Sequence, residues 1–334
     1  MKKVVVIGGG TGTFVVLSAL KAISGMDLTA IVTVADSGGS TGRLRDEFGF
    51  LPVGDLRQAL AALATEKNSG GNEQTWIRDL LLYRFAKGSG LEGHNLGNLI
   101  LTSLQDMTGS TAKAVEVASK IFRLHGHIYP ITTQNIQLVI EYQDGTVEIG
   151  EHVLDDSVKH AGDKILSLKT SPQAVIYDKA KAAIEKASVI IIGPGDLYGS
   201  IMPNLIVNGA PTAFQRSGAK LVFMMNLMTR YTQTHNMTAG DHLAVIERQI
   251  GRKFDAVIIN NEVIPAKILT AYREQHEYPV LDDLNGNQGR KIIRAHLLKS
   301  ALAEQKKADA VHRSYLRHDP IKLSKVLKKI IYES

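Results

Sequence analysis

The residues best suited to chemistry in this chain lie in three glycine-rich segments, and the first is Gly8-Gly9-Gly10-Thr11-Gly12-Thr13. Glycine lets backbone N–H groups come close to a pyrophosphate, and a helix that begins here adds the positive end of its dipole. We therefore expect Gly9, Gly10, Thr11 and Gly12 to contact the phosphate or ribose of a nucleotide. The third glycine of a complete G-x-G-x-x-G fingerprint would stand at Thr13, so a turn kept for tight packing remains the alternative.

The second segment is Asp36-Ser37-Gly38-Gly39-Ser40, which comes shortly before Arg43 and Arg45. Its N–H groups and hydroxyls could form an anion-binding nest, and the two arginines would supply countercharge. Asp36 stands about where dinucleotide-binding folds place a ribose-binding carboxylate. All five residues are therefore candidate ligand contacts, and a plain flexible loop is the alternative.

The third segment begins with Gly193-Pro194-Gly195-Asp196 and continues through Tyr198 toward Asn204. Two asparagines are further candidate ligand contacts. Asn98 ends a polar turn, and Asn226 follows directly after an apolar run that is expected to be a strand. The carboxyl ends of parallel strands share one edge of a sheet, so we expect these segments to converge on one crevice. A tight turn around Pro194 and a loop-stabilising role for Asn98 are the alternatives.

Continuous apolar runs predict the strands that would position these segments. Each run is followed by a glycine-containing or polar turn and then a helical pattern, which is typical of a buried parallel sheet. The runs are Lys3 to Ile7, Thr29 to Ala35, Val189 to Ile192, Leu221 to Met225 and Ala256 to Ile259. Further helices are expected after Asp55, taken as an N-cap, and over Glu73 to Ala86 and Thr111 to Phe122.

The middle of the chain has a different pattern. Gln137 to Tyr142 and Thr146 to Ile149 flank Asp144-Gly145, which indicates a β-hairpin, and Ile165 to Leu168 could add a strand. The predicted fold is α/β, with a doubly wound, mostly parallel Rossmann-like sheet and a small antiparallel insertion. We expect one domain over residues 1–334 with a β-rich insertion at about 128–170.

Composition narrows the class of protein. The 334 residues carry a net charge of +6 and no cysteine, which suits anionic ligands and excludes disulfides and thiolate metal sites. No apolar stretch approaches the length of a membrane span, so we expect a cytoplasmic protein without stable membrane insertion. No nucleic-acid-binding signature is present, and homo-oligomerisation stays open.

Metal ligands are sparse in the sequence. His125 and His127 form an H-x-H pair that could face one side of a strand, but no other ligand stands nearby. Asp155-Asp156 could hold magnesium together with a phosphate, and solvated surface aspartates are the alternative. We expect no dedicated metal site formed by the protein alone.

Several motifs together resemble one family. The sequence contains GGGTGT, ADSGGSTGRLRDEFGFLPVGDLRQAL, GHNLGN, GPGDLYGSIMPNL, NLMT and RHDP. Their order and spacing are similar to the gluconeogenesis-factor (YvcK) branch of the family shared with 2-phospho-L-lactate transferase, over nearly the whole chain. The chain departs from that pattern at Asp196, at Gly199 and over Arg230-Tyr231-Thr232-Gln233.

The resemblance implies a Rossmann-like core that binds either NAD or a UDP-sugar similar to UDP-N-acetylglucosamine. It implies contacts from Tyr272 and Arg317 to the sugar nucleotide, although a tyrosine packed in the core and a structural arginine remain the alternative. It also implies a role in cell shape and in growth on gluconeogenic carbon sources, with cell-wall synthesis proteins as partners and no established catalysis.

Two other functions stay open at this point. A magnesium-dependent phospho-group transferase is supported by the loops shared with 2-phospho-L-lactate transferase. It is weakened because Val53-Gly54-Asp55-Leu56-Arg57 lacks the second aspartate of that branch. An NAD-dependent oxidoreductase would use the first glycine turn and Asp36, but no acid–base pair for hydride transfer is visible.

Overall fold

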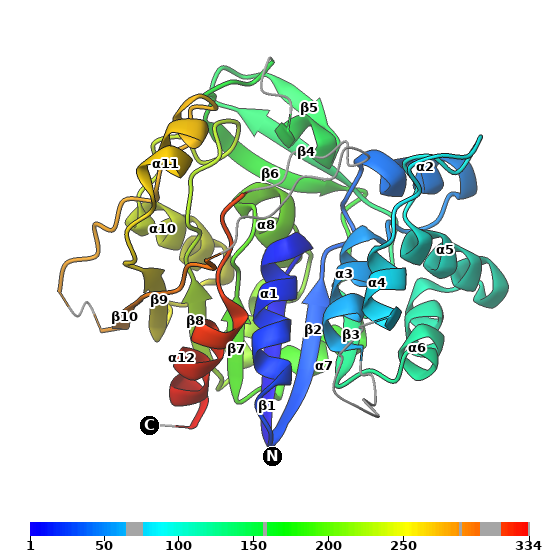
Figure 1. Cartoon of the computed structure of the whole chain (residues 1–334), viewed down its shortest axis with the longest axis horizontal. Helices are drawn as coiled ribbons and strands as arrows, with labels where there is room; N and C mark the ends of the chain where they lie inside the picture. Colours follow the sequence, from blue (N-terminus) through cyan, green and yellow to red (C-terminus); the bar gives the residue numbers. More distant parts are fainter. Residues whose placement is uncertain (65–75, 156–158, 287–288, 301–314, 333–334) are drawn as a thin grey trace.

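A seven-stranded parallel sheet forms the centre of the molecule (Figure 1). The structure is a computed structural model that describes residues 1–64, 76–155, 159–286, 289–300 and 315–332. The sheet order is β10-β9-β8-β7-β1-β2-β3. The strands are β1 (Lys2–Gly8), β2 (Met26–Val32), β3 (His127–Pro130), β7 (Val189–Ile192), β8 (Lys220–Met224), β9 (Ala256–Asn260) and β10 (Lys291–Ala295).

This sheet confirms the predicted doubly wound α/β fold. The inner strands are continuous apolar runs because helices cover both faces, and all four residues of β7 are buried. From β1 the chain builds outward to β2 and β3, and it later returns to β7 beside β1 and continues to β10. The direction of winding therefore reverses between β1 and β7, where open α/β sheets bind ligands.

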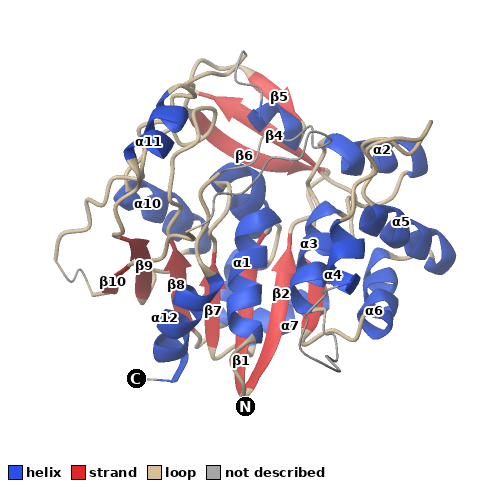
Figure 2. Cartoon of the chain, in the orientation of Figure 1, coloured by secondary structure: helices blue, strands red, loops and turns tan. Residues whose placement is uncertain are grey.

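Helices lie in a layer on each side of the sheet (Figure 2). The front layer in that view contains α1 (Gly10–Lys21), α3 (Gly54–Leu63) and α12 (Pro320–Tyr332), with α2 (Gly39–Phe48), α4 (Trp76–Leu82), α5 (Leu96–Thr108) and α6 (Thr111–Ile121) beside them. The back layer contains α7 (Asp178–Glu185), α8 (Met202–Leu205), α9 (Ala210–Arg216) and α10 (Ala239–Ile250). The apolar side chains of α12 pack beside α1, so this basic helix uses its apolar face inside the fold.

A second, antiparallel sheet lies across the carboxyl ends of the parallel strands (Figure 1). Its order is β5-β4-β6, formed by β4 (Gln137–Tyr142), β5 (Val147–Ile149) and β6 (Ile165–Ser171). A 3₁₀ turn, η1 (Glu151–Asp155), follows β5, and helix α11 (Ala266–Arg273) lies near the same edge. The small antiparallel insertion is thus confirmed.

Several element boundaries differ from the sequence predictions. Residues 127–130, expected to start the insertion, pair with β2 as the edge strand β3. The second strand begins at Met26 and ends at Val32, three residues before the expected end. No helix was predicted for the second glycine-rich segment, but its end opens α2, whose C-cap is Gly49 with φ of +72°.

The helix expected over Glu73 to Ala86 is shorter than predicted. Residues 73–75 lie outside the described residues, and the described part, α4, ends at Leu82. Beyond it, the N–H of Phe85 donates to the backbone oxygen of His94, so tertiary pairing replaces helical hydrogen bonds. Among the described residues, no helix is long and apolar enough to cross a membrane.

Candidate functional site

A cavity of about 600 Å³ lies between the carboxyl ends of the parallel strands and the turn that follows β5. This volume is in the range of cavities that hold small ligands and cofactors. The three glycine-rich segments converge on it, which confirms the predicted arrangement. The predicted residues that line it are Gly9, Gly10, Thr11, Gly12, Asp36, Gly38, Gly39, Ser40, Asn98, Pro194, Gly195, Asp196, Asn226 and Arg317.

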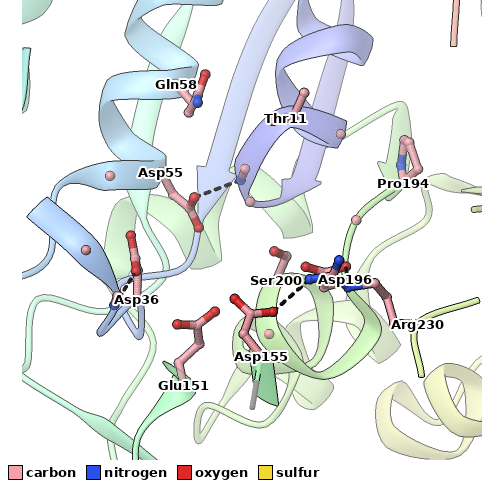
Figure 3. Close-up of a pocket in the computed structure, with 18 of the residues that line it drawn as sticks. Thr11, Asp36, Asp55, Gln58, Glu151, Asp155, Pro194, Asp196, Ser200 and Arg230 are labelled. Atoms are coloured by element: carbon pink, nitrogen blue, oxygen red, sulfur yellow. Dashed lines mark hydrogen bonds and ion pairs between the residues drawn. The ribbon is translucent and has the colours of Figure 1, made fainter. Parts of the chain in front are cut away.

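The first segment forms the start of α1. Gly9 is the N-cap residue, and the N–H of Gly10 donates to Oδ1 of Asp55 at 2.7 Å (Figure 3). A Cβ atom at Gly12 would lie 2.0 Å from the backbone oxygen of Pro194. Glycine is therefore required at this position, because it lets the first and third segments pack backbone to backbone.

Asp55 has a different role from the one predicted. It was expected to be the N-cap of its helix, but Val53 occupies that position and Asp55 lies in the first turn of α3. Its side chain instead reaches across to α1. An aspartate in the first helical turn is favourable beside the helix dipole of α3, and here it also accepts an N–H from a second helix.

The second segment is held by a buried network. Oδ1 of Asp36 accepts the N–H of Gly38 at 2.9 Å, which shapes the turn into α2. Nδ2 of Asn98 donates to Oγ of Ser40 at 3.3 Å, and Oδ1 of Asn98 accepts from Nε of Arg57 at 2.8 Å. Asn98 thus links α2, α3 and α5 while it also lines the cavity.

The third segment is tied to its neighbours by two asparagines. Asn226 accepts the N–H of Gly195 at 3.0 Å and donates to the oxygen of the same residue at 2.8 Å. Asn204 donates to the backbone oxygens of Gly8, at 3.1 Å, and Ser200, at 2.8 Å. A π-helical turn over Leu197–Ile201 lies between Gly195 and Asn204 in the chain, and such turns are often found at functional sites.

Five predicted contacts do not reach the cavity wall: Ser37, Gly193, Tyr198, Asn204 and Tyr272. Each of the first four instead makes a backbone or side-chain hydrogen bond to another segment of the fold. Tyr272 is a correction of the expected geometry, since its side chain is fully buried against Met228 and Leu316. Its hydroxyl accepts the N–H of Leu316 at 3.0 Å, so it supports the segment that brings Arg317 to the cavity.

Two acidic side chains from the turn after β5 face the middle of the cavity: Asp155, considered above for magnesium, and Glu151, which no sequence motif indicated. Figure 3 shows Glu151 and Asp155 between Asp36 on one side and Asp196 on the other. Burial, followed by the nearby carboxylates of Asp36 and Asp155, holds the pKa of Glu151 well above its ordinary value. Burial thus favours the protonated form of Glu151, in which the carboxyl group can donate a hydrogen bond as well as accept one.

A second group of charges surrounds Arg230. Its Nη2 lies 2.7 Å from Oδ1 of Asp155, and its Nε and Nη1 lie 3.6 Å from carboxylate oxygens of Asp196 and Glu277. Burial raises the pKa of Glu277 to about 7, against the opposing effect of Arg230. No spacing in the sequence joins these residues, since they come from four separate segments.

The sequence analysis also missed other lining residues, of which Asp55, Arg57, Gln58, Arg84, Ser200 and His318 are examples. Asp55 to Gln58 lie inside the family motif that begins at Ala35, and this position in the motif could have indicated that they line the site. Within the described residues, no three histidine or acidic side chains are grouped to hold a metal ion. Asp156, half of the aspartate pair considered for magnesium, lies outside the described residues.

Comparisons with known proteins agree with this architecture. Residues 4–298 match the family model described as 2-phospho-L-lactate transferase CofD. The gluconeogenesis factor of Bacillus subtilis is 34% identical, covering 99% of this chain and 98% of that protein. The gluconeogenesis factor of Halalkalibacterium halodurans is 39% identical over 84% of each chain.

A solved structure shows the same fold. A crystal structure of a UPF0052 family protein from Bacillus halodurans has a TM-score of 0.86 and 35% sequence identity, with complete coverage of both chains (100% each). The sequence match and the shared fold extend over nearly the entire length. The chain therefore belongs to the CofD/UPF0052 family, and the relatives that it matches over nearly its full length include gluconeogenesis factors.

Proposed function

We propose that this protein binds a nucleotide or nucleotide-sugar and acts as a regulatory gluconeogenesis factor. The observation that carries the proposal is the convergence of three glycine-rich segments on one 600 Å³ cavity at the point where the sheet reverses its winding. Such a position, with a helix N-terminus beside it, is the usual place for a nucleotide diphosphate in an α/β fold.

The side chains suggest how the ligand would lie. The diphosphate would rest on the first turn of α1, and the ribose would approach Asp36 after β2. The group beyond the diphosphate would then extend toward Asn226 and Arg230, which follow β8. Candidate ligands are UDP-sugars, including UDP-N-acetylglucosamine, and NAD.

Isothermal titration of the purified protein with UDP-N-acetylglucosamine, UDP-glucose, NAD and GTP tests the binding. Saturable binding of at least one nucleotide, lost when Arg317 is replaced by alanine, is the expected result. A mass spectrum of the co-purified small molecules identifies the ligand independently. No binding by any of the four compounds would contradict the proposal.

The cellular part of the proposal draws on the family resemblance, and the names of the relatives support only its link to gluconeogenesis. It includes the role in cell shape, growth on gluconeogenic carbon sources and cell-wall synthesis proteins as partners. Deletion in the native host should impair growth on such carbon sources and change cell shape. The wild-type chain should restore both, and a folded variant that does not bind the ligand should restore neither.

A magnesium-dependent phospho-group transferase is the second candidate. The family model supports it, as do Asp36 and Asp55, whose carboxylates point into the cavity in Figure 3. Incubation of a bound nucleotide-linked substrate with magnesium, followed by ³¹P NMR, tests this function. Magnesium-dependent release of nucleoside monophosphate would favour it over a purely regulatory role.

A further inference from the structure

The arginines at the two ends of the cavity differ in the groups that they contact. At the β2 side, Arg43 and Arg84 line the wall, and their guanidinium groups donate to the neutral backbone oxygens of Glu92 and Gly93. At the β8 side, Arg230 faces three carboxylates, those of Asp155, Asp196 and Glu277. We call these four residues the Arg230 cluster.

The Arg230 cluster is acidic in sum even though an arginine is at its centre. One guanidinium faces three carboxyl groups, of which Glu277, with a pKa raised to about 7 by burial, is only partly ionised at neutral pH. Arg230 is directed at these partners rather than held ready for a phosphate. Glu277 lines the cavity although only 7% of its surface is exposed. The side chains of Asp155 and Asp196 are 37% and 40% exposed, so a ligand group placed here meets a net negative field that water screens in part.

The cluster is fixed by the surrounding backbone. The N–H of Arg230 donates to Oγ1 of Thr234 at 2.8 Å, and Oγ1 of Thr232 donates to the backbone oxygen of Leu154. On the other side, the N–H of Thr229 donates to the oxygen of Tyr278 at 2.7 Å. These bonds join the segment after β8 to the 3₁₀ turn η1 and to the segment after α11, so the charges cannot easily rearrange around a ligand.

We infer that the Arg230 cluster selects nucleotide-sugars whose sugar is uncharged and bears hydroxyl groups, and that it rejects those whose sugar carries a carboxylate. The inference rests on the proposed function, because the direction of the ligand places the sugar at the β8 side. Carboxylates accept hydrogen bonds from sugar hydroxyls, whereas an anionic sugar brings like charges together in a partly screened cavity.

UDP-glucose and UDP-glucuronate are a matched pair of probes, because they differ only in a hydroxymethyl or carboxylate group at carbon 6 of the sugar. Isothermal titration of the full chain should show that UDP-glucuronate binds more than tenfold more weakly, which corresponds to about 1.4 kcal/mol. Asp196→Asn removes one negative charge at nearly constant shape, and it should narrow this ratio. Arg230→Gln should widen it.

Asp46→Asn is the control for the loss of a surface carboxylate. Asp46 also pairs with an arginine, at 2.7 Å, but its side chain is 68% exposed and does not line the cavity. It should leave the ratio unchanged, and thermal melting of each variant confirms that it is folded. Equal affinities for the two probes, or an Asp196→Asn ratio equal to wild type, would overturn this inference alone. Failure of both probes to bind would overturn this inference, and the proposed function would fall with it only if UDP-N-acetylglucosamine, NAD and GTP also fail to bind.

Discussion

At the scale of single residues, the site depends on backbone segments that approach one another closely. Gly12 and Pro194 belong to different glycine-rich segments, and an ideal Cβ atom on Gly12 would lie 2.0 Å from the oxygen of Pro194. Neither partner can give way by a side-chain rotation, because the conflict is with the backbone. The glycine therefore holds the α1 start and the third segment at their present separation.

Gly12→Ala is expected to push these two segments apart and to weaken nucleotide binding by at least about tenfold, or roughly 1.4 kcal/mol. Gly218→Ala is the matched control, since no atom lies within 4 Å of a Cβ placed there. Titration with the best-binding nucleotide, together with thermal melting, measures both effects. Unchanged affinity in Gly12→Ala would show that the close approach is not needed for binding.

Glu277 leads to a prediction about pH. Its pKa is raised from 4.5 to about 7 by burial, so between these values the folded chain binds more protons than the unfolded chain. Its contribution to the free energy of unfolding must therefore fall as the pH rises from about 5 to about 8. Glu277→Gln removes this titration, and its stability relative to wild type should be greater at the higher pH.

Urea unfolding of the wild type and Glu277→Gln at both pH values measures that difference. Other titrating groups cancel in the comparison, because both proteins contain them. A difference in unfolding free energy that does not change with pH would mean that Glu277 titrates at its ordinary value in the folded protein.

At the scale of elements, helix α11 supports the segment that leads into α12. Tyr272 is fully buried on α11 and accepts the N–H of Leu316, while the adjacent Arg317 lines the cavity. Support of this segment and the proposed ligand contact are thus divided between two parts of the chain that are far apart in the sequence. The two roles can be separated by substitution.

Tyr272→Phe should lower the free energy of unfolding by about 1 kcal/mol, because it removes a buried hydrogen-bond acceptor. It should change the affinity for the nucleotide-sugar little. Arg317→Ala should do the reverse, with affinity reduced by more than about tenfold and a nearly unchanged melting temperature without ligand. If Tyr272→Phe alone abolished binding at full stability, Tyr272 would have to act on the ligand directly.

At the scale of the whole molecule, the cavity is formed by parts that belong to different layers of the fold. The parallel sheet supplies the glycine-rich segments, and the turn after β5 supplies Glu151 and Asp155. A ligand in this cavity would contact both parts, and it would bind the folded chain only. Its binding should therefore stabilise the entire fold.

A nucleotide-sugar present at about 100 times its dissociation constant should raise the free energy of unfolding by about 2.7 kcal/mol. Thermal melting with increasing ligand measures this, and the shift should continue to grow with ligand concentration. The Arg317→Ala variant should show a smaller shift at the same concentration. A nucleotide that binds without any thermal shift would have comparable affinity for the unfolded chain, which contradicts a site built by the fold.

Much of the parallel core could be predicted from the sequence alone. The run Val189 to Ile192 matches β7 at both ends, because continuous β-branched residues suit a strand buried on both faces. The glycines after β1, β2 and β7 were identified because few residues other than glycine allow a close approach of the backbone. The convergence of these segments followed from one rule, that parallel strands end at the same edge.

Tertiary structure alone decided the acidic half of the cavity. Asp155 and Asp196 stand out in the sequence for separate reasons, the first beside Asp156 and the second in a glycine-rich segment. No spacing joins them to Arg230 or Glu277. It also decided that Tyr272 supports the cavity wall from the core. Periodicity reports which face of an element is buried, but the partners of a charged or aromatic side chain depend on how separate elements pack.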